Sequence, residues 1–124
     1  MKALPVLPTL LLLAALGGCQ YGGETTIPAE LHGVWKASQQ KYADRFFELT
    51  PNTVSVGIGK GNKETYAVRR IKKAREGDKT LYAIHYTDSE GLESKIFLAY
   101  EPQGGGLIRF RNQKETAWKR ARAE

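Results

Sequence analysis

The segment FFELTPNTVSVGI, residues 46–58, indicates the fold most directly. Phe47 and Leu49 alternate with other side chains, and so do Val54, Val56 and Ile58, which is the period-2 pattern of a strand with one buried face. Pro51-Asn52 separates the two runs and is typical of a turn. The segment therefore predicts a β-hairpin.

Similar runs recur every 8–15 residues and are separated by Gly, Asn and Asp. Val68 and Ile71 are three positions apart, so a β-bulge at Arg69-Arg70 is needed to keep both on one face. No amphipathic helix is evident, although short helical turns fit at 28–31 and 38–43. We expect an all-β domain, a small up-and-down antiparallel barrel or strongly bent meander. Eight strands are predicted, at 33–37, 45–50, 53–58, 63–72, 79–87, 93–101, 106–111 and 115–120.

The N-terminal segment has the pattern of a secretory signal. Lys2 precedes an apolar stretch that is too short to span a bilayer, and small residues follow it. Residues 1–18 are therefore predicted to be a signal peptide. Residues 19–29 form a short polar tether, and residues 30–124 form one domain. No second cysteine is present, so neither a disulfide nor a cysteine-based metal centre is expected.

Leu16-Gly17-Gly18-Cys19 resembles the lipobox of bacterial lipoproteins. The resemblance implies cleavage before Cys19, a diacylglycerol on its sulfur and further acylation, including palmitate, on the new amino group. Two or more acyl chains anchor a protein stably. Gln20 in place of Asp implies an outer-membrane address. The expected location is therefore the bacterial cell envelope, where the lipid anchor holds the protein on the outer membrane facing the periplasm.

Gly33-x-Trp35 resembles the motif of the first strand in lipocalin-like barrels, in particular the small lipocalin-like domains of bacterial lipoproteins. The resemblance implies that a basic residue of the last strand, Lys119 or Arg120, lies over Trp35 and closes the barrel bottom. Trp35 and Trp118 are otherwise expected to be core or barrel-end residues.

Positive charge is the second unusual feature. The chain has a net charge of +6, and loss of Lys2 with the signal leaves 18 basic against 13 acidic residues. One interpretation is a patch for an anionic surface, and the other is a solvated strand face that prevents edge aggregation. The envelope location argues against nucleic acid as a partner. The predicted anionic-surface residues are Arg69, Arg70, Lys72, Lys73 and Arg75.

Catalytic and metal-binding patterns are missing from the sequence. His32 and His85 belong to no ligand set, and His85 is expected to face solvent. We therefore expect a protein that is not an enzyme and has no cofactor and no metal. The expected function is binding of a small amphiphilic ligand or lipid in the barrel. The alternative is an accessory or pilotin-like assembly lipoprotein that docks on an envelope complex. Four inward tyrosines are predicted to contact the ligand: Tyr66, Tyr82, Tyr86 and Tyr100.

Overall fold

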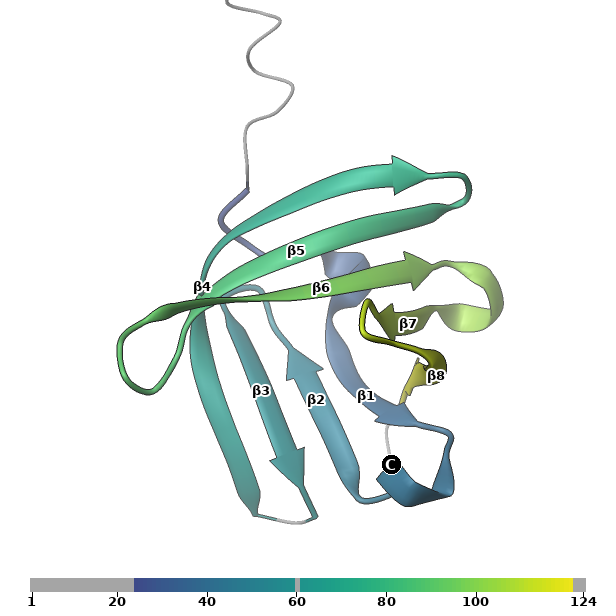
Figure 1. Cartoon of the computed structure of the whole chain (residues 1–124), viewed down its shortest axis with the longest axis horizontal. Coiled ribbons are helices and arrows are strands. Elements are labelled where there is room, and N and C mark those ends of the chain that lie inside the picture. The colour runs from purple at the N-terminus through teal and green to yellow at the C-terminus, as the bar shows by residue number, and fades with distance from the viewer. Residues whose placement is uncertain (1–23, 60, 122–124) are drawn as a thin grey trace, which may run out of the picture.

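The computed structural model describes residues 24–59 and 61–121. This part of the chain is almost entirely β-structure (Figure 1). The strands are β1 (Gly33–Ala37), β2 (Arg45–Leu49), β3 (Thr53–Ile58), β4 (Asn62–Glu76), β5 (Lys79–Thr87), β6 (Glu93–Glu101), β7 (Leu107–Phe110) and β8 (Gln113–Arg120). Three 3-10 turns accompany them: η3 (Ala29–Leu31), η4 (Gln40–Tyr42) and η5 (Gln103–Gly105).

The eight strands form a closed antiparallel barrel in which each strand pairs with the next along the chain. β1 and β8 complete the ring, with Trp35 opposite Arg120 and Ala37 opposite Trp118. The predicted all-β barrel of about eight strands is confirmed, and so are the two helical turns. β1 and β8 are therefore not open edge strands, because their backbone groups form hydrogen bonds with each other.

β4 is the strand that bends the barrel most clearly. Its first half pairs with β3 up to Ala67, and its second half pairs with β5 from Ala67 to Glu76. Figure 1 shows β4 rising beside β3 and then continuing beside β5. The register shifts between Val68 and Arg70, which confirms the predicted bulge. β4 extends four residues beyond the predicted end at 72, because residues 73–76 continue to pair with β5 although none of them is buried.

The core fills one end of the barrel. Its largest fully buried side chains include Trp35, Leu31, Ile84 and Ile108. Ile27 is also buried, and its N–H donates to the carbonyl oxygen of Pro51 at 2.9 Å. The packed part of the chain therefore begins before residue 30, because part of the predicted tether lies against the barrel.

A cation closes this packed end. The Arg120 guanidinium lies 4.5 Å from the centre of the Trp35 ring. It also donates hydrogen bonds to the carbonyl oxygens of His32, Gly105 and Glu30, at 3.1, 2.8 and 2.6 Å. Gly33 has a φ of +131°, and a Cβ there would lie 3.2 Å from the Arg120 side chain. Arg120, rather than Lys119, is thus the residue over Trp35.

His85 corrects one expectation from the sequence. Its side chain was predicted to face solvent, yet the residue is only 3 % exposed. Its Nδ1 lies 2.9 Å from a carboxylate oxygen of Glu93, and Arg70 lies 3.8 Å from the same oxygen. The hydrogen bond from His85 holds the pKa of Glu93 below its ordinary value. Alternation identified the strand face correctly, but it does not show which polar neighbours cover that face.

Tyr82 predicts a pH dependence of stability. It is 2 % exposed and donates a hydrogen bond to the Glu30 carboxylate, and burial raises its pKa well above the ordinary value. Unfolded Tyr82 ionises above pH ~10, whereas the folded side chain stays neutral, so its contribution is complete below that pH and is lost as pH rises. We expect the free energy of unfolding to fall by up to ~1.4 kcal/mol per pH unit above pH ~10. Urea unfolding of wild type and Tyr82→Phe from pH 9 to 11 measures this, and equal slopes in the two proteins would contradict it.

Candidate functional site: an open barrel mouth

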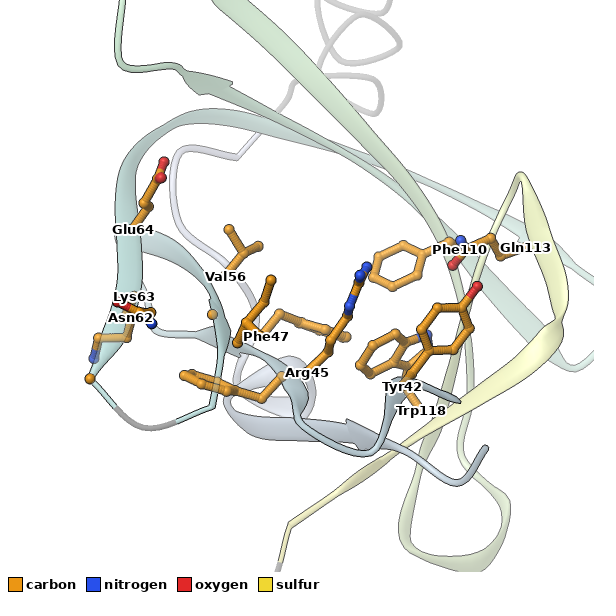
Figure 2. Close-up of a pocket in the computed structure, with 14 residues that line it drawn as sticks. Tyr42, Arg45, Phe47, Val56, Asn62, Lys63, Glu64, Phe110, Gln113 and Trp118 are labelled. Atoms are coloured by element: carbon orange, nitrogen blue, oxygen red, sulfur yellow. The ribbon is translucent and has the colours of Figure 1, made fainter. Parts of the chain in front are cut away.

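A cavity of about 790 Å³ opens at the end of the barrel that the core does not fill (Figure 2). It lies where β2, β4 and β8 begin and where β3 and β7 end. The segment between β1 and β2 and the β3–β4 turn flank it. Its lining residues are Tyr42, Arg45, Phe46, Phe47, Val56, Gly57, Ile58, Gly61, Asn62, Lys63, Glu64, Phe110, Gln113 and Trp118.

The strand register explains why this end is open. Trp35 pairs with Phe47, and Phe47 pairs with Val56, so all three point to the same side of the sheet. Trp35 and Phe47 are buried, whereas Val56 is 41 % exposed and Ile58, two residues on, is 49 % exposed. Apolar side chains on the inward face therefore remain uncovered at the mouth. Apolar walls that water can reach are what a ligand-binding cavity needs.

Aromatic rings form one wall of the mouth. The ring centres of Phe47, Phe110 and Trp118 lie 5.1–5.7 Å from one another. Tyr42 stacks on the outer side of Trp118 at 6.5 Å. Figure 2 shows Phe110, Trp118 and Tyr42 gathered on one side, with Val56, Lys63 and Glu64 across the cavity. Separations of this size are typical of stabilising aromatic pairs, so the rings of this wall pack favourably against one another without a ligand.

Trp118 carries an unpaired donor in this wall. The residue is 6 % exposed, and its Nε1–H is buried with no hydrogen-bond partner among the described residues. Buried donors in native proteins are nearly always paired, because an unmade hydrogen bond costs about 1–3 kcal/mol. Trp35, by contrast, donates its indole N–H to the Leu31 carbonyl oxygen at 3.0 Å. Trp118 is therefore a lining residue of the mouth whose buried donor lacks a partner among the described residues.

Charged side chains surround the opening. Arg45 lies 5.5 Å from the Tyr42 ring centre, and Lys63 forms a 3.4 Å ion pair with Glu48. Glu64, the acidic member of the lining, accepts a hydrogen bond from Tyr66 at 2.5 Å, which raises the pKa of that phenol. Arg45 is thus the lining cation that no described carboxylate neutralises within ion-pair distance.

The four predicted ligand tyrosines do not meet at the mouth. Tyr66 and Tyr86 form a tilted pair at 5.3 Å, and neither lines this cavity. Tyr100 packs edge-on against Trp35 in the core, and Tyr82 is bonded to Glu30. Sequence reasoning missed Tyr42, Arg45 and Gln113 as lining residues. Their only signal is a position at a predicted strand start or within three residues before one, which many residues share.

The five predicted anionic-surface residues are exposed but do not share one face. Arg69 occupies the bulge. Arg70 and Lys72 pair with His85 and Ala83, whereas Lys73 and Arg75 alternate with them and pair with Tyr82 and Thr80. Arg70 is also close to Glu93. The basic run is therefore distributed over both faces of β4.

The described residues include no group of three or more metal-ligating side chains and no helix long and apolar enough to cross a membrane. Cys19 and the rest of the predicted signal and lipobox lie outside the described residues. Comparison of the chain with protein-family models, with curated proteins and with solved structures gave no match.

Proposed function

We propose that this protein is a lipid-anchored lipoprotein of the bacterial envelope that binds a small amphiphilic ligand in the barrel mouth without catalysis. The observation that carries the proposal is an open cavity with an aromatic and aliphatic lining, which includes Trp118, whose buried N–H has no partner among the described residues. A volume of about 790 Å³ lies within the usual range of small-molecule sites, about 300–1,000 Å³.

The lining determines the chemistry of the ligand. Phe47, Phe110 and Val56 suit an apolar body, which gains about 25 cal/mol for each Å² of apolar surface removed from water. The Trp118 N–H requires an acceptor, and Arg45 at the rim favours negative charge. A single-chain amphiphile with a carboxylate or a similar anionic oxygen group satisfies all three requirements.

The anchor part of the proposal rests on Leu16-Gly17-Gly18-Cys19. The backbone of Glu24 bonds to Ile71 of β4, which fixes the point where the chain leaves the barrel. Cys19 is five residues earlier, a distance of at most ~18 Å. A lipidated Cys19 therefore keeps the barrel close to the membrane surface, where amphiphiles are concentrated.

The likeness to small lipocalin-like domains supports a binding role. Gly33 and Trp35 lie on the first strand, and Arg120 covers Trp35 from the last strand, in the arrangement that the resemblance implies. One end of the barrel is closed and the other is open, so a small ligand would enter and leave the barrel at one end.

Trp118→Phe tests the site, because it keeps an aromatic ring and removes the donor. We expect the affinity for decanoate to fall about tenfold or more, since a hydrogen bond to a charged acceptor contributes ~1.5–3 kcal/mol. Binding is measured by calorimetry on residues 19–124 carrying Cys19→Ser. Decylammonium has the same chain but no acceptor for the indole, so wild type binds it more weakly than decanoate.

Thr116→Val is the matched control. It removes another buried donor from β8, a hydroxyl that bonds to Gln39 outside the cavity. The control keeps its preference for decanoate, whereas Trp118→Phe reduces it. Equal binding of the two ligands by wild type, or unchanged decanoate affinity in Trp118→Phe, would refute the mouth as the binding site.

A further inference from the structure

A second groove lies on the outside of the barrel, across β4, β5, β6 and β7, and has a volume of about 660 Å³. The register builds it from two cross-strand rows. Lys72 pairs with Ala83 and Ala83 with Phe97, while Leu81 pairs with Ala99 and Ala99 with Arg109. These residues alternate with the buried Tyr82 and Leu98, so they point away from the core.

The floor of this groove is apolar where a solvated sheet face is normally polar. Phe97 is 39 % exposed, and Leu81, Ala83 and Ala99 around it are partly exposed. The Arg111 guanidinium lies 4.5 Å from the centre of the Phe97 ring, and the Arg111 N–H donates to the Phe97 carbonyl oxygen at 3.0 Å. An aromatic ring and aliphatic side chains thus remain open to solvent beside a fixed positive charge.

The walls of the groove are basic. The lining includes two acidic residues, Glu76 and Glu101, and Glu101 forms a 3.6 Å ion pair with Arg109. The other cations of the lining form no ion pair with a described carboxylate within 4.0 Å. The basic residues that line it are Lys72, Lys79, Arg109, Arg111 and Lys114, together with Lys73, whose position on β4 alternates with that of Lys72.

We propose that this outer groove binds one anionic phospholipid molecule, with an acyl chain on Phe97 and Leu81 and the phosphate between Lys72 and Arg111. Charge complementarity selects an anion, and the apolar floor selects an anion that carries a hydrocarbon chain. Arg suits phosphate because its planar guanidinium group donates hydrogen bonds to two phosphate oxygens at once. The groove is distinct from the barrel mouth, so a different set of variants tests it.

The groove lies near the N-terminal end of the barrel, where the proposed membrane anchor would bring phospholipids close to it. Lys72 directly follows Ile71, whose backbone bonds to Glu24, so one wall of the groove lies beside the point where the chain enters the barrel. The proposal rests on the proposed envelope location only for this supply. The experiment below adds the lipid, and its result does not depend on lipidation of Cys19.

Native mass spectrometry of the full chain in a nonionic detergent measures the selectivity. The probes are dioleoyl phosphatidylglycerol and dioleoyl phosphatidylcholine in equal amounts, which share acyl chains and differ in net charge. We expect the wild-type protein to retain more phosphatidylglycerol than phosphatidylcholine. Lys72→Gln/Arg111→Gln reduces that preference about thirtyfold, because each basic residue contributes ~1 kcal/mol toward an anionic lipid.

Lys36→Gln/Lys119→Gln is the matched control. These exposed lysines pair with each other on β1 and β8, line neither cavity and carry the same total charge. The control keeps the lipid preference within about twofold. Phe97→Ser is a second variant, on an exposed ring, and it weakens binding of both lipids while the circular dichroism spectrum stays that of a β-barrel.

Three results would overturn the proposal. The first is equal retention of the two lipids by wild type, and the second is an undiminished preference in Lys72→Gln/Arg111→Gln. The third is displacement of the lipid by an equimolar competitor. Displacement by inorganic phosphate would assign the groove to a free anion. Displacement by an acidic peptide such as hexaglutamate would assign it to a protein partner.

Discussion

Trp35→Ala is expected to lower the free energy of unfolding by about 3–5 kcal/mol, which is a large part of the stability of a small domain. Trp35 is 0 % exposed and stacks with Phe47 and against Tyr100. It also supports the Arg120 guanidinium that closes the packed end. Truncation leaves a cavity and takes away the surface on which that charge lies.

Urea denaturation, followed by circular dichroism, measures the effect of Trp35→Ala. Phe97→Ala is the control, because it removes another aromatic ring from a position that is 39 % exposed. The control should shift the free energy of unfolding by about 1 kcal/mol or less. A midpoint in Trp35→Ala that equals the wild-type midpoint would refute the importance of this packing.

Cys19→Ala is expected to abolish lipid labelling and membrane retention completely. The proposed anchor has a single attachment point, the Cys19 sulfur, and the substitution removes the group that receives the diacylglycerol. Metabolic labelling with an alkyne fatty acid in a bacterial host, followed by membrane fractionation, provides the measurement.

Ser89→Ala, in the exposed β5–β6 turn, serves as the control for labelling and should be labelled like wild type. If Cys19→Ala is labelled to the same extent, the lipobox interpretation is wrong. The barrel itself is expected to fold in both variants, because the core formed by the described residues begins at Ile27, well after Cys19.

Most of the fold was predictable from alternation. Ile108 and Phe110 alternate with Arg109 and Arg111. This pattern predicts a strand with one buried face, and the prediction does not depend on which strands are its neighbours. The spacing of Val68 and Ile71 predicted the bulge for the same reason, because both must reach the core. The end of β4 was not predictable, since residues after Lys72 are solvated on both faces and carry no alternation.

The binding surfaces were less predictable because they depend on how distant segments meet. Trp118 appears in the sequence as an ordinary core residue, and only the structure shows that its N–H lacks a partner. The outer groove joins Lys72 of β4 to Arg111 after β7 through the strand register. A run of basic residues is visible in the sequence, but the alternation of β4 divides it between two faces.

The pairing of β1 with β8 has a consequence for how the chain folds. All other pairings join consecutive strands, so the loops that they close are short. Contact between Trp35 and Arg120 instead closes a loop of most of the domain, and the entropy of loop closure grows with loop length. The hairpins therefore have a kinetic advantage, and the seam forms after them. We therefore expect the contact of Arg120 with Trp35 to act mainly on the unfolding rate, and thus on the lifetime of the closed barrel.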